Sequence, residues 1–121
     1  MYIVGGIIKT MAGEDIPDGC IHVVGGKIAE IGRRDEVTVH PAAYEKVLEI
    51  KKGLVMPGII EAHCHMGITE EKKGMEGDDC NETVDPITPW LRAVDAVNTM
   101  DAAFDDAVRA GITSAMIGPG S

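Results

Sequence analysis

The 121-residue sequence predicts an α/β fold: a small, mostly antiparallel β-sheet followed by a strand–helix–strand unit. Three observations support this prediction. Short apolar segments separated by glycine and proline turns fill residues 2–52, an apolar run ends in two histidines near residue 64, and one amphipathic helix precedes the apolar segment 112–117. We expect residues 1–56 to form the sheet and residues 57–121 to form the second part.

The N-terminal sheet is predicted from its strands and turns. Apolar residues on both sides of Gly25 and Gly26 indicate a β-hairpin, because a Gly-Gly loop can take the positive φ values that tight hairpin turns require. Gly5 and Gly6 indicate a bulge or kink within the first strand. Residues 17–19 predict a turn, residues 33–44 a loop or one helical turn, and residues 46–50 a further strand.

His63 and His65 are the candidate metal ligands. They end the apolar run that follows Pro57 and Gly58, and alternate side chains of a strand point to the same face. Both imidazoles can therefore converge on one ion. Glu61 shares this face, whereas Cys64 lies on the other and is expected to pack.

The strand–helix–strand unit rests on an apolar stripe with helical spacing. Asn98 or Thr99 can cap the helix and Gly111 is placed to end it. Residues 112–117 then predict the second strand. The stripe consists of Met100, Ala103, Phe104, Ala107 and Val108.

A long polar loop, residues 66–91, separates the histidines from the helix. Between residues 67 and 85 it carries seven acids and two bases, a local balance of -5. Loops of this length are often functional, although a solvent-exposed acidic loop without a function is the simpler interpretation. Trp90 is a candidate anchor, and no single acid of the loop is assigned to catalysis.

The string VMPGIIEAHCHMG, residues 55–67, resembles the PG[LIF]ID-x-H-x-H signature of the amidohydrolase superfamily. GGKIAEIG upstream and EGDDCNETVDPITPWLRAVDAVNTMDAAF with AGITSAMIGPGS downstream resemble its imidazolonepropionase-like members, so the resemblance covers essentially the whole chain. One departure is Glu61, which stands where the family usually has aspartate.

The resemblance implies a (β/α)₈ TIM barrel, preceded by a sheet that is one part of a composite β-sandwich. Such a barrel needs about 250 residues, so the chain corresponds to the N-terminal portion, with an incomplete barrel. The resemblance also implies a divalent metal, with zinc as the expected ion, held in part by His63 and His65. The implied reaction is hydrolysis of non-peptide C–N bonds in small molecules, cyclic amides in particular, by metal-activated water.

Composition excludes several classes of partner. A net charge of -9 and 3% aromatic residues argue against nucleic acid and anionic membranes. No apolar run approaches the roughly 18 residues needed to span a bilayer, and no signal-peptide pattern is expected at the N-terminus. Cysteines at 20, 64 and 80 are odd in number and form no CxxC, which indicates reduced thiols and a cytoplasmic location. A zinc site built from them with His22 or His40 is disfavoured, because the spacings match no structural zinc pattern.

Three functional hypotheses follow. The first is that the chain is the N-terminal fragment of an amidohydrolase, or of a deaminase of the same superfamily. We then expect the chain alone to bind metal weakly and to have no turnover. No catalytic or cofactor-binding residue beyond the two ligands is assigned. The second is a non-catalytic fragment or assembly partner whose open strand edges favour a homo-oligomer. The third is a small module that uses the histidine pair to bind metal without chemistry.

Overall fold

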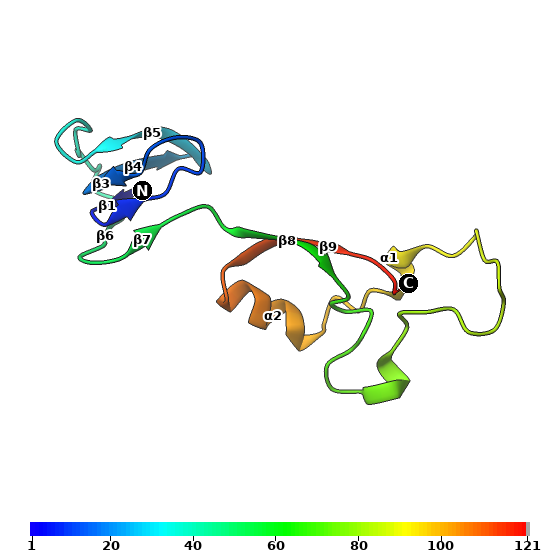
Figure 1. Ribbon diagram of the computed structural model, residues 1–121. Coiled ribbons are helices and arrows are strands. Elements are labelled where there is room, and N and C mark those ends of the chain that lie inside the picture. The colour runs from blue at the N-terminus through cyan, green and yellow to red at the C-terminus, as the bar shows by residue number, and fades with distance from the viewer. Residues whose placement is uncertain (121) are drawn as a thin grey trace. The chain divides into compact units, whose positions relative to one another are not determined.

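The protein is described by a computed structural model for residues 1–120, and it divides into two compact units (Figure 1). We call Met1–Pro57 the N-terminal unit and the part from Gly58 onward the C-terminal unit. Each unit is described by itself. Among the helices of residues 1–120, none combines the length and the apolar character that crossing a bilayer requires.

Two small sheets make up the N-terminal unit, where a single sheet was predicted. The first has the strand order β5-β4-β1-β6, and the second has the order β3-β2-β7. The strands are β1 (Tyr2–Val4), β2 (Ile7–Ile8), β3 (Ile16–Pro17), β4 (Gly19–Val24), β5 (Lys27–Arg33), β6 (Val47–Glu49) and β7 (Leu54–Val55).

Gly5 and Gly6 explain why there are two sheets. Both have positive φ, +87° and +69°, and they carry the chain from β1 into β2. A Cβ on Gly5 would lie only 2.5 Å from the Ile50 carbonyl oxygen, so no other residue fits. The predicted bulge within one strand is thus a break between two strands.

Strand pairing is antiparallel in the hairpin and parallel at one edge of each sheet. The β4–β5 hairpin confirms its prediction, with Gly25 and Gly26 at φ +57° and +77° in the turn. The parallel pairs β1–β6 and β2–β7 were not expected. They arise because residues 47–55 follow the same path from one sheet to the other as residues 2–8.

A small apolar core holds the first sheet together. Tyr2, Val4, Cys20 and Val37 are buried in it, and Val39 packs against them. The Cys20 side chain is fully buried, and this burial raises the pKa of its thiol. Cys20 is therefore a core residue.

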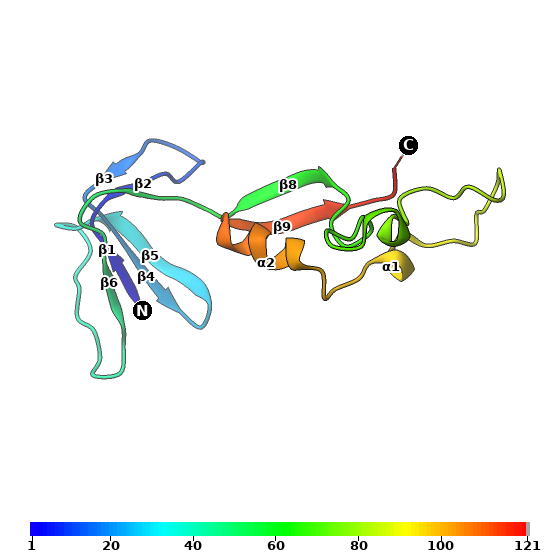
Figure 2. The same cartoon turned by 90° about the horizontal axis from the view of Figure 1, so that it is seen from below.

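The C-terminal unit is built on a parallel strand pair. β8 (Ile59–Cys64) pairs with β9 (Ile112–Ile117), and α2 (Ala102–Arg109) packs beside them (Figure 2). The predicted strand–helix–strand unit and the predicted second strand are confirmed. The remaining elements are a 3₁₀ turn, η1 (Gly74–Gly77), and the single-turn α1 (Ala93–Ala96).

Helix α2 begins later than the apolar stripe predicted. Asp101 is the N-cap, and its carboxylate accepts a hydrogen bond from the Ala103 amide at 2.8 Å, so Asn98 and Thr99 do not cap the helix. Met100 lies before the cap and is 88% exposed, so it is not part of the stripe. The buried carboxylate of Asp101 thus satisfies one of the free amides of the first turn, which favours a helix start at this residue.

The first half of the acidic loop is ordered by contacts with the residues that precede α2. The Asn98 amide donates to the Gly67 carbonyl at 2.8 Å, and the Glu71 amide donates to Asp101 Oδ2 at 3.0 Å. Ile68, in the same segment, is buried. Trp90 is 68% exposed in the described residues and does not anchor the second half.

Candidate metal centre

The two predicted ligands lie together at the C-terminal end of β8. His63 is in the strand and His65 follows its last residue. Their ring centroids are 5.2 Å apart and their planes are 84° from parallel. Two imidazoles bound to one tetrahedral ion through nitrogens about 2.0–2.1 Å away have ring centres roughly 5 Å apart. The two side chains are thus spaced as a shared metal requires.

His65 is oriented by the end of the neighbouring strand. Its Nδ1 lies 2.7 Å from the carbonyl oxygen of Gly118, directly after β9. Because a carbonyl only accepts, Nδ1 carries the proton and Nε2 keeps its lone pair free for a metal. Metal-binding histidines commonly donate their other N–H in this way. The Gly118 amide in turn donates to the Cys64 carbonyl at 3.2 Å.

Glu61 and Cys64 have local roles. Glu61 Oε1 accepts a hydrogen bond from the His63 amide at 3.1 Å, so its carboxylate is held beside the first ligand on the same strand. The Cys64 thiol donates to the Met116 carbonyl of β9 at 3.4 Å. Cys64 is therefore engaged with the adjacent strand.

The pair is not a complete catalytic centre within this part of the molecule. Across residues 1–120, no group of three or more His, Cys, Asp or Glu side chains is placed to hold a metal. Catalytic zinc sites typically have three protein ligands. The residues present fit two positions of such a site.

The other histidines have different surroundings. His22 stacks on Tyr2 with centroids 4.0 Å apart, and its Nε2 lies 3.1 Å from Glu45 Oε1. His40 is in an exposed loop of the N-terminal unit. All three cysteines are free thiols, and Cys20 is inside the core of the N-terminal unit.

Glu70 is the best-connected acid of the loop, and its role is structural. Its carboxylate accepts hydrogen bonds from Lys73 Nζ at 3.0 Å and from Asn98 Nδ2 at 2.6 Å. These bonds, that of Lys73 above all, lower the pKa of Glu70. This cluster was not predicted from the sequence.

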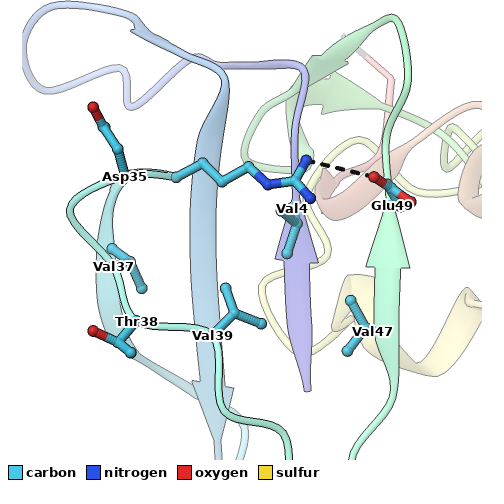
Figure 3. Close-up of a pocket in the computed structure, with 8 residues that line it drawn as sticks. Val4, Asp35, Val37, Thr38, Val39, Val47 and Glu49 are labelled. Atoms are coloured by element: carbon cyan, nitrogen blue, oxygen red, sulfur yellow. Dashed lines mark hydrogen bonds and ion pairs between the residues drawn. The ribbon is translucent and has the colours of Figure 1, made fainter.

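A groove in the N-terminal unit contains no comparable chemistry (Figure 3). An ion pair between Arg34 Nη1 and Glu49 Oε1, 3.4 Å apart, lies across it. Its other lining residues are mainly small aliphatic side chains of the core and its edge: Val4, Val37, Val39 and Val47, with Asp35 and Thr38.

Comparison with known proteins supports the resemblance. No family model matches the chain. It is 40% identical over 65 residues to Amidohydrolase tasK of Hapsidospora irregularis, covering 53% of this chain and 6% of that protein. It is 36% identical over 94 residues to 5'-deoxyadenosine deaminase of Methanococcoides burtonii, covering 76% of this chain and 19% of that protein.

Its fold matches part of a solved amidohydrolase. The crystal structure of an amidohydrolase from Thermotoga maritima matches with a TM-score of 0.84 and 29% identity, over 99% of this chain and 30% of that one. The chain therefore belongs to the amidohydrolase superfamily. It spans less than a third of each of these relatives, which fits the predicted correspondence to an N-terminal portion.

Proposed function

We propose that this chain supplies the first two metal ligands of an amidohydrolase that hydrolyses non-peptide C–N bonds. The observation that carries the proposal is the pairing of His63 with His65, whose rings lie 5.2 Å apart while Gly118 orients the second ring. A bound divalent ion, with zinc expected, would supply Lewis-acid polarisation of the scissile carbonyl and acidification of water.

The strand pair supports a place in a (β/α)₈ barrel. β8 and β9 are parallel, yet Ile60 is 73% exposed and Met116 51% exposed. Parallel sheets are normally covered on both faces, so we propose that β8 and β9 are the first two strands of a barrel that further sequence completes. His63, His65 and Gly118 lie at the C-terminal ends of these strands, where barrel enzymes have their active sites.

This placement assigns the two parts of the chain to different domains of the enzyme. We assign residues 57–121 to the barrel and residues 1–56 to the composite sandwich that accompanies it. The remaining ligands and the group that moves the proton would come from later barrel strands. The three free thiols support a reducing compartment such as the cytoplasm.

A deaminase is the second candidate, because one relative is named 5'-deoxyadenosine deaminase. Both reactions would use a bound metal to polarise an sp² carbon. In a complete enzyme, an assay for released ammonia would distinguish the two, since hydrolysis of a cyclic amide opens the ring without releasing ammonia.

Metal titration tests the proposal directly. We expect cobalt(II) or zinc to bind the chain, and His63→Ala and His65→Ala each to weaken binding by roughly tenfold or more. His40→Ala is the matched control, because His40 lies in an exposed loop of the N-terminal unit. Unchanged affinity in His65→Ala would contradict the proposed site.

Turnover provides a second test. We expect no hydrolysis of cyclic amides by the 121-residue chain alone, because two imidazoles are fewer than the three ligands of a catalytic zinc site. Robust turnover by the purified chain would show that the site is complete without further sequence.

A further inference from the structure

Part of the acidic loop returns to the strand ends that hold the candidate metal centre. The amide of Gly120 donates a hydrogen bond to the carbonyl of Cys80 at 2.8 Å. Cys80 is buried, and its sulfur lies 3.0 Å from Thr69 Oγ1. These contacts fix the position of the next residue in the loop, Asn81.

The Asn81 carboxamide lies directly over the backbone of Gly120. A Cβ built on Gly120 would be 2.8 Å from Asn81 Nδ2 and 2.9 Å from Oδ1. Gly120 follows Gly118, whose carbonyl binds His65, by only two residues. Two residues span at most about 7 Å. Asn81 is thus at the same strand ends as the candidate ligands.

Asn81 offers chemistry that the histidines do not have. The residue is exposed. A carboxamide presents a donor and an acceptor side by side. It can therefore form two parallel hydrogen bonds with a planar group of the same kind, as asparagine does with the edge of adenine.

We propose that Asn81 is a substrate-binding residue that recognises the planar N–C=O or N–C=N edge of an amide or amidine. The inference rests on the proposed function and adds the part of the substrate that the Asn81 side chain would bind. Gly120 is part of the same binding site, because the absence of its Cβ leaves room for the Asn81 carboxamide.

Two substitutions test the proposal with a built-in cross-check. Asn81→Ala removes the carboxamide, whereas Gly120→Ala displaces it with a methyl group. If the carboxamide is what matters, both variants weaken substrate binding and the double variant is no weaker than Asn81→Ala alone. Asn81→Asp keeps the shape but removes the N–H donor, so we expect it to weaken binding as well.

The measurement is the Kd of hydantoin, a planar cyclic amide, determined by calorimetry in the presence and absence of zinc. We expect an increase of about tenfold in Asn81→Ala and Gly120→Ala, as the loss of one or two hydrogen bonds predicts. Zinc affinity and melting temperature should stay at the wild-type values.

The failure of this inference can be told apart from failure of the proposed function. No binding of hydantoin by the wild type, or equal Kd in wild type and Asn81→Ala, would overturn the role of Asn81. So would a loss of zinc affinity in Asn81→Ala, which would indicate a structural role. Absence of zinc binding by the wild type would instead overturn the proposed metal centre, while the hydantoin titration without zinc still tests Asn81.

Discussion

Single residues of this protein are fixed by close contacts with backbone atoms. Gly67 illustrates this for the loop that follows the histidines. It has φ +73°, and its carbonyl accepts the Asn98 amide. A Cβ would lie 2.9 Å from both the Asn98 carbonyl oxygen and the Phe104 ring. The turn that leads away from the candidate metal centre thus depends on the absence of a side chain at this position.

Gly67→Ala should destabilise the C-terminal unit by more than the backbone strain alone, which is about 1–2 kcal/mol. The extra loss comes from overlap of the methyl group with the Asn98 carbonyl oxygen and the Phe104 ring. Gly74→Ala is the matched control, because Gly74 also has positive φ, +60°, but has open space around its Cβ position. Urea unfolding of both variants measures the difference, and equal losses would contradict the packing argument.

Glu45 is the residue with the clearest pH dependence. The Ala42 amide, in the first place, and then His22 lower the pKa of Glu45 to about 2 from 4.5. Since the folded-state pKa is the lower one, this stabilisation is fully present above about pH 4.5 and is lost as the pH falls toward 2. We expect the melting temperature to fall across this window.

Glu45→Gln should flatten that acid dependence, because glutamine keeps a hydrogen-bonding oxygen but does not titrate. Glu14→Gln, at an exposed turn, is the control and should retain the wild-type slope. Thermal melts followed by circular dichroism between pH 2.5 and 6 give the comparison. The same slope in Glu45→Gln and wild type would show that other carboxylates are responsible.

Secondary-structure elements were predictable where their signals are local. The Gly25-Gly26 hairpin and β9 were predicted correctly, because turn glycines and a continuous apolar run act within a few residues. The start of α2 was not, since Asn98, Thr99 and Asp101 are all good capping residues. Tertiary contacts decide among them. Asn98 donates hydrogen bonds to the Gly67 carbonyl and to the Glu70 carboxylate, whereas the buried Asp101 also accepts one from the Glu71 amide.

Asp101→Ala is the prediction for helix α2. It should cost about 1–2 kcal/mol, because it removes the N-cap and leaves the Glu71 amide without its partner. Asp105→Ala removes an exposed acid from the first turn of the same helix and should cost a few tenths of a kcal/mol. Chemical denaturation compares the two, and equal effects would argue against a special role for Asp101.

For the whole molecule, the sequence supported the family and the histidine pair but not the arrangement around them. His63 and His65 were predictable because period two places both on one face. The Gly118 carbonyl and the carboxamide of Asn81 were not, because their positions depend on the register of β8 with β9 and on the return of the loop. The glycines at 118 and 120 were the available signal, and they resembled an ordinary turn.

Exposed apolar side chains lead to a prediction about association. Ile60 is 73% exposed on β8, and Ile28 and Leu54 are 60% and 58% exposed in the N-terminal unit. Uncovered apolar faces and open strand edges favour self-association. We expect the isolated chain to form dimers or larger species at high concentration in size-exclusion chromatography with light scattering.

Ile60→Thr should reduce this association, whereas Val84→Thr should not. Val84 is similarly exposed, at 85%, but lies in the acidic loop. A stable monomer at every concentration would count against the assembly-partner hypothesis as well.

The hydrogen bond between His65 and the Gly118 carbonyl links metal binding to the pairing of β8 with β9. A ligand that binds only the folded state stabilises it by about 2.7 kcal/mol at a concentration of 100 times its Kd. Because the ring that would hold the metal is oriented by the residue after β9, that energy would favour the paired arrangement of β8 and β9. Amide hydrogen exchange at Gly118, whose N–H is bonded to Cys64, would then slow when zinc is added. The metal would then stabilise the C-terminal end of the strand pair in addition to its role in the reaction.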